Sequence, residues 1–144
     1  METRTLIRVT MIAASFALIV LLFVLMIDVL TLAVRVLTGL TAVAALFGIV
    51  ALGLVALIAP AVVYSAYGRG MPTRRLLVRF LLVTGIQGFL FALTEGARRA
   101  LLHTVGPGVA DATLGSLNHL IAILGTAGGF LALIAAWAVR RRAR

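Results

Sequence analysis

Long stretches without any ionisable residue constrain the fold of this chain more than any other feature. Examples run from Val9 to Ile27 and from Thr41 to Val63. A continuous apolar run of about 18 or more residues is long enough, as an α-helix, to cross the hydrocarbon core of a membrane. Of the 144 residues 63% are hydrophobic, and a water-soluble fold of this length could not bury so much apolar surface. The sequence therefore predicts an all-α integral membrane protein.

Helix breakers and charged residues divide the chain into four predicted helices, at about residues 5–37, 40–67, 73–103 and 113–141. The first two connections, Thr38-Gly39 and Gly68 to Pro72, are short, so the helices that they join must be antiparallel. We expect residues 1–144 to form a single domain, an antiparallel up-down-up-down bundle of four transmembrane helices.

The arginines predict an orientation, because cytoplasmic segments of membrane proteins carry an excess of positive charge. Ten arginines fall at the end that holds both termini and the loop between the second and third helices, and three fall at the other end. We expect a protein of the inner or plasma membrane with both termini in the cytoplasm. The ten are Arg4, Arg8, Arg69, Arg74, Arg75, Arg79, Arg140, Arg141, Arg142 and Arg144, and the three are Arg35, Arg98 and Arg99.

The basic end also predicts which partners the chain meets. A net charge of +9 without a soluble domain or interleaved surface aromatics favours the anionic lipid headgroups of the bilayer. Nucleic acid is not expected as a partner.

Small residues recur at every fourth position on one face of the third helix, and the fourth helix repeats the pattern. Such a ladder lets two helix backbones approach closely in lipid. We predict close helix contacts at Thr84, Gly88, Ala92, Gly96, Gly125 and Gly129, with Ile86, Leu90, Leu93 and Ala97 facing lipid. By the same reasoning the first helix should pack through Thr10, Ala14, Ala17, Asp28 and Arg35, with Ile12, Ile19, Phe23 and Leu30 facing lipid.

Polar residues gather at the end opposite the termini. Ionisable groups at membrane depth are costly, so they are functional candidates by default. The predicted polar cluster contains Asp28, Arg35, Glu95, Arg98, Arg99 and His119. With Asp111, three acids balance three arginines at this end, which favours a structural network of ion pairs. The alternative is a proton- or cation-coupled transport site built on Glu95 and Asp28, with His119 as a relay.

Gln87 lies about 12 Å along the helix from Arg79, near the middle of the bilayer. We favour a hydrogen bond from this amide to another helix. The alternative is a small-molecule site between the helices. Its lining would be Gln87, Phe91, Thr94, Glu95, Asn118 and His119.

Several kinds of chemistry lack a supporting pattern. The chain has no cysteine, no phosphate-binding glycine loop and no recognisable zinc-ligand spacing. His103 and His119 flank one predicted loop, whereas a bis-histidine haem needs ligands that face each other across the core. We therefore expect no catalysis, no cofactor and no metal.

The sequence favours a structural or assembly subunit, as a homo-oligomer or within a larger membrane complex. A small-molecule-binding bundle and a small coupled transporter are the alternatives. The chain could be natural or a de novo design, because short turns, similar helix lengths and the absence of lysine and cysteine suit both.

Overall fold

The computed structural model describes residues 2–105 and 112–142, which form four α-helices and no strand. α1 spans Thr3–Val36, α2 Leu40–Gly68, α3 Thr73–Val105 and α4 Ala112–Arg141. The predicted helix ends differ from these by no more than two residues. Each helix is long and apolar enough to cross a membrane. The predicted all-α fold class and the four candidate spans are thereby confirmed.

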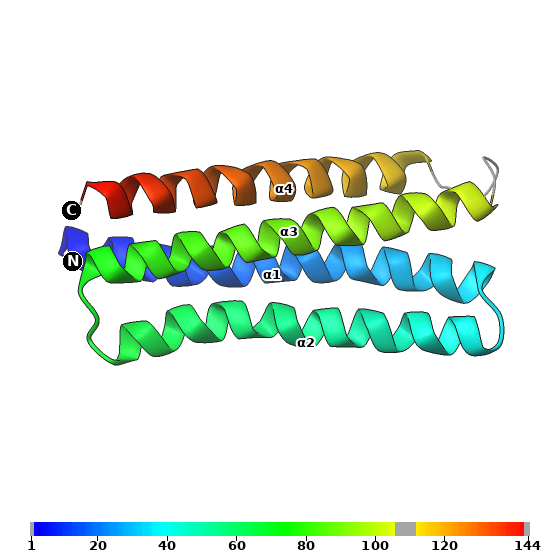
Figure 1. Cartoon of the computed structure of the whole chain (residues 1–144), viewed down its shortest axis with the longest axis horizontal. Helices are drawn as coiled ribbons and strands as arrows, with labels where there is room; N and C mark the ends of the chain where they lie inside the picture. Colours follow the sequence, from blue (N-terminus) through cyan, green and yellow to red (C-terminus); the bar gives the residue numbers. More distant parts are fainter. Residues whose placement is uncertain (1, 106–111, 143–144) are drawn as a thin grey trace.

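The chain reverses direction at two glycines with a left-handed backbone. Gly39 has φ of +62° just before α2, and Gly70 has φ of +67° between α2 and α3. A side chain would be strained at either position. These tight turns make α1 antiparallel to α2 and α2 antiparallel to α3 (Figure 1).

α3 is the helix that organises the bundle, because it packs against each of the other three. Its contact with α4 is the most extensive, and α2 and α4 lie on opposite sides of the α1 and α3 pair (Figure 1). We call the end that holds the start of α1, the α2–α3 connection and the end of α4 the termini end, and the opposite end the far end.

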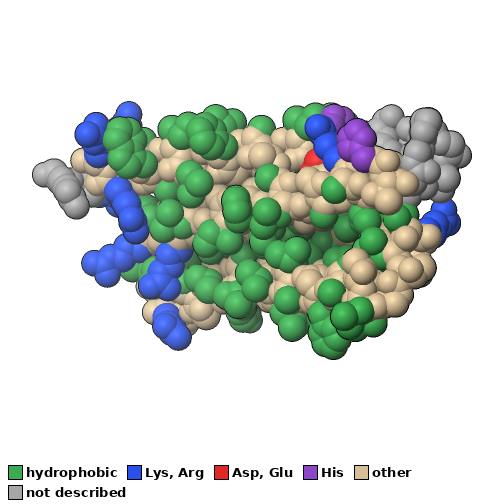
Figure 2. All heavy atoms as spheres, turned by 45° about the vertical axis from the view of Figure 1, so that its right-hand side comes forward, with side chains coloured by type: hydrophobic (Ala, Val, Ile, Leu, Met, Phe, Trp, Pro, Cys, Tyr) green, Lys and Arg blue, Asp and Glu red, His purple; other side chains and the backbone are tan. Residues whose placement is uncertain are grey.

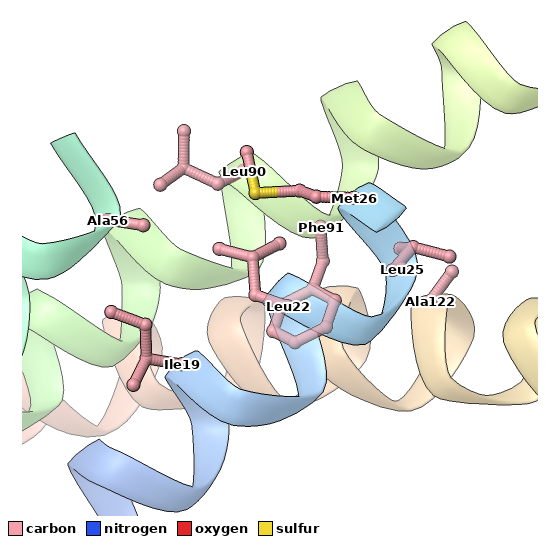
Figure 3. Packing of buried hydrophobic residues seen from close by; sticks show 8 residues of the cluster. All are labelled: Ile19, Leu22, Leu25, Met26, Ala56, Leu90, Phe91 and Ala122. Atoms are coloured by element: carbon pink, nitrogen blue, oxygen red, sulfur yellow. The ribbon is translucent and has the colours of Figure 1, made fainter. Parts of the chain in front are cut away.

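The apolar core forms two clusters along the bundle. The central cluster draws on all four helices and is shown in Figure 3. The cluster at the termini end draws on α1, α2 and α3, and its buried members include no residue of α4. At the termini end the buried residues of α4, Ala132 and Ala136, lie outside this cluster. The central cluster contains Ile19, Leu22, Leu25, Met26, Ala56, Leu90, Phe91 and Ala122; that at the termini end contains Met11, Ala59, Val63, Ala66, Leu76 and Val83.

α3 and α4 come closest at a pair of glycines. A β-carbon added to Gly88 would lie 2.5 Å from the Gly129 Cα and 3.1 Å from the Gly125 carbonyl oxygen. Gly125, one turn along α4 toward the far end, is covered by the ring of Phe91. The two backbones therefore touch at Gly88 and Gly129 without a side chain between them, as small residues permit.

The other members of the predicted ladder lie differently. Thr84 is half-buried and donates its hydroxyl to the Phe80 carbonyl of its own helix. Ala92 and Gly96 are exposed, and a β-carbon at Gly96 would meet nothing within 4 Å. They do not form the close backbone contact that their spacing predicts, and both line a groove between α3 and α4.

Several residues predicted to face lipid are instead buried. Leu90 of α3 and Ile19 of α1 belong to the central cluster, and Phe23 packs against it. Conversely, Thr10, Ala17 and Arg35 of the predicted packing face are exposed. In α1 large apolar side chains, not small ones, fill the centre of the bundle, where Ile19, Leu22 and Leu25 belong to the central cluster.

We predict that Gly129→Ala lowers the free energy of unfolding by about 1–3 kcal/mol, because the added methyl group would collide with the Gly88 backbone. Its neighbour Gly128 faces open space, so Gly128→Ala is the matched control. This control should be neutral or slightly stabilising, since alanine is the better helix former. Thermal or denaturant unfolding in detergent measures both variants. Equal stability of the two would show that the glycine contact contributes nothing.

Candidate functional site

The strongest polar feature is a cluster around the carboxylate of Glu95, near the far end. Arg98 donates from Nε to Oε2 at 2.8 Å and from Nη2 to Oε1 at 3.0 Å. Arg99 donates from Nε to Oε1 at 3.0 Å. His119 Nδ1 lies 2.9 Å from Oε1, close enough to donate when the ring is protonated at that nitrogen. Both carboxylate oxygens are therefore engaged by groups of the same chain. We call these four residues the Glu95 clasp.

Helix geometry and the glycine contact together assemble the Glu95 clasp. Arg98 and Arg99 follow Glu95 by three and four residues, which places all three on one face of α3. His119 comes from α4. Because α3 and α4 are antiparallel, moving from the Gly88 and Gly129 contact toward the far end reaches Glu95 on one helix and His119 on the other (Figure 1). The clasp thus joins α3 to α4 two turns beyond their closest point.

Burial divides the Glu95 clasp into a strong and a weak part. Glu95 and Arg98 are 8% and 5% exposed, and their bidentate pair is out of water. The side chains of Arg99 and His119 are 59% and 40% exposed, so their contributions are smaller. Figure 2 shows arginine, histidine and acidic side chains together at this part of the surface.

The remaining members of the predicted polar cluster are less closely joined to Glu95. Asp28 of α1 is half-buried and forms no ion pair among the described residues. Arg35 is exposed at the end of α1. Asn118 is buried beside His119 in sequence. Asp111 lies outside the described residues.

A second polar feature lies between the two apolar clusters. Gln87 is fully buried, and neither its nitrogen nor its oxygen has a hydrogen-bond partner among the described residues. The interhelical hydrogen bond that we predicted for it is therefore not formed there. Ser15 of α1 is also fully buried, and its hydroxyl has no hydrogen-bond partner within residues 2–105 and 112–142. Along α1, Ser15 lies between Met11 of the cluster at the termini end and Ile19 of the central cluster. Along α3, Gln87 lies in the same way between Val83 and Leu90. Sequence reasoning missed Ser15, because a single serine in an apolar run has no periodic signal.

Within the described part of the chain, most residues of the predicted small-molecule lining are buried or already hydrogen-bonded. Phe91 is 1% exposed. Its ring lies against Gly125 and fills the gap between α3 and α4 at that level. The Thr94 hydroxyl donates to the Leu90 carbonyl at 2.7 Å. Of the predicted residues, Glu95 does line a groove between α3 and α4, with a volume of about 600 Å³. Ala92, Gly96, Thr126 and Phe130 are among its other walls.

The described side chains limit the chemistry of the Glu95 clasp. Among them, no three His, Asp or Glu residues are grouped closely enough to hold a metal ion. The arrangement can hold two helices together through charge, and it presents a carboxylate whose hydrogen-bonding capacity is already used.

Comparisons with protein-family models, with curated proteins and with solved structures find no match to this chain.

We predict that Glu95→Gln lowers the free energy of unfolding by about 3–5 kcal/mol, because it leaves the buried Arg98 guanidinium without its counter-charge. Arg99→Gln, on the exposed side of the same carboxylate, should cost less than about 1 kcal/mol. The double variant Glu95→Gln with Arg98→Met should recover part of the loss. Unfolding in detergent tests all three. A Glu95→Gln variant no less stable than Arg99→Gln would contradict the structural role.

Proposed function

We propose that this chain is a non-enzymatic membrane bundle that acts as a structural or assembly subunit. The observation that supports it is the use of the Glu95 carboxylate within the chain. Two arginines and one histidine engage both of its oxygens. A transport acid must exchange its partner for a proton or cation during each cycle, whereas an acid in a buried bidentate pair would have to break that pair first. The Glu95 clasp is better suited to fixing α4 on α3.

We further propose that both termini lie in the cytoplasm and that the termini end meets anionic lipid headgroups. The support is the arginine excess at that end, where Arg8 also ties the start of α1 to the α2–α3 connection. Its Nε donates to the Thr73 hydroxyl at 3.1 Å and its Nη2 to the Met71 carbonyl at 3.2 Å. Arg141 lies over the Trp137 ring, 4.3 Å from its centre, an arrangement suited to the membrane interface.

The subunit role is tested by two measurements on the same purified protein. In bilayer discs formed directly from the source membrane, native mass spectrometry should find the chain bound to a second copy or to another polypeptide. In proteoliposomes, an imposed pH gradient should produce no chain-dependent proton or cation flux beyond protein-free vesicles. A chain that is always alone, together with a flux that Glu95→Gln abolishes, would replace this proposal with a transporter in which Glu95 carries the proton.

The orientation is tested with single cysteines, because the chain has none of its own. Gly68 and Thr38 are exposed at opposite ends of the bundle, so Gly68→Cys and Thr38→Cys form a matched pair. In intact cells, an impermeant thiol reagent should label Thr38→Cys and should label Gly68→Cys only after lysis. The reverse pattern would invert the topology.

A further inference from the structure

A basic groove opens between the first turns of α3 and the last turns of α4, at the termini end. Its volume is about 600 Å³. It lies beside the apolar cluster at the termini end, against which Met71 of the groove packs. Figure 2 shows arginine side chains gathered at this end of the molecule. Four of them, Arg74, Arg75, Arg79 and Arg140, line the groove around an apolar floor of Val78 and Val139.

These four positive charges have no acidic partner within the described part of the chain. Every ion pair found there involves Glu95, near the far end. Arg74 is held across the groove by a hydrogen bond from Nη2 to the Val139 carbonyl, at 3.1 Å. The other three arginines are exposed. Like charges confined to one concave surface repel each other unless an anion joins them, so the groove is an electrostatic site for an anion.

The backbone of α3 adds to this positive potential. α3 begins at Thr73, and the amide of Leu76 bonds to the Pro72 carbonyl. The amides of the residues before Leu76 therefore precede the hydrogen-bonded ladder of the helix. The N-terminus of a helix carries a partial positive charge and attracts phosphate. The helix end and the four guanidinium groups thus act on the same region.

The surroundings of the groove favour a lipid over a soluble anion. Its floor is apolar, and the α4 surface that continues toward the middle of the bundle exposes Leu133, Ile134 and Trp137. Guanidinium groups bind phosphate oxygens in bidentate fashion, and a volume of this size exceeds the needs of one phosphate. We infer that the groove binds the headgroup of a dianionic phospholipid, with its phosphates on the arginines and its acyl chains along α4. This inference rests on the membrane insertion within the proposed function, and not on the assembly role.

Trp137 provides the measurement, because it is the one tryptophan of the chain and lies on α4 next to the groove. The purified chain is placed in bilayers of phosphatidylcholine that contain a brominated lipid, whose bromine atoms quench tryptophan fluorescence. The brominated lipid is cardiolipin, with two phosphates, or phosphatidylglycerol at twice the mole fraction to match the charge. Quenching should report a relative binding constant for cardiolipin about tenfold above that for phosphatidylglycerol.

Two double variants remove equal charge from the same end. Arg75→Gln with Arg79→Gln removes groove arginines, and Arg4→Gln with Arg69→Gln removes exposed arginines that do not line the groove. The groove variant should lose the cardiolipin preference, about tenfold in binding constant, while the control should change it by less than about twofold. Both should keep the parent's unfolding temperature in zwitterionic detergent, since all four side chains are exposed.

Three results would overturn the inference. Equal losses of the cardiolipin preference in the two double variants would show that the preference comes from the overall positive charge of the termini end and not from the groove. A cardiolipin preference no greater than that for phosphatidylglycerol at matched charge would show that the groove does not recognise two phosphates on one lipid. Displacement of brominated cardiolipin by micromolar inorganic pyrophosphate would show that the site takes a soluble phosphate.

Discussion

The direct contact between the backbones of α3 and α4 at Gly88 and Gly129 is the constraint on which the rest of the bundle depends. It fixes the register of the two helices, because no side chain separates them at this point. If one helix slid along the other, a side chain would have to occupy the place of a glycine and would collide with the partner's backbone. That register brings His119 to Glu95 on one side of the contact and Val139 to Arg74 on the other. The Glu95 clasp and the basic groove are therefore two consequences of one close approach.

The two ends of the bundle handle charge in opposite ways. At the far end, Glu95 neutralises Arg98 inside the protein, which costs desolvation but makes that end largely independent of its surroundings. At the termini end, the arginines form no ion pair among the described residues. One end of the bundle is therefore held together by its own charges, while the charges of the other end are left for the solvent or for a ligand.

Much of the fold could be predicted from the sequence, but not which helix faces pack. Charged residues, prolines and glycines set the helix ends, and they are discrete signals. The packing faces of α1 could not be identified in this way, because nearly every residue in the span is apolar and no hydropathy contrast separates core from lipid. Ile19 is thus assigned to lipid although it lies in the central cluster. On α3, Leu90 is assigned to lipid because it lies opposite the polar residues, but α3 packs against all three other helices and buries it. Similarly, Glu95 and Gln87 were equally unusual at membrane depth, but only the three-dimensional arrangement supplies one with partners and leaves the other without.

The small-residue ladder shows why spacing alone predicts too many contacts. Two helices that pack at an angle are closest at one point and diverge on either side of it. Only ladder members near that point can meet the partner backbone, so Gly88 touches Gly129 while Gly96, two turns on, faces open space. The divergence also creates the grooves: one beside Ala92 and Gly96, and one beside Arg74 and Arg140. Small side chains wall the first groove and arginines line the second, so both grooves lie where the ladder no longer brings the two backbones into contact.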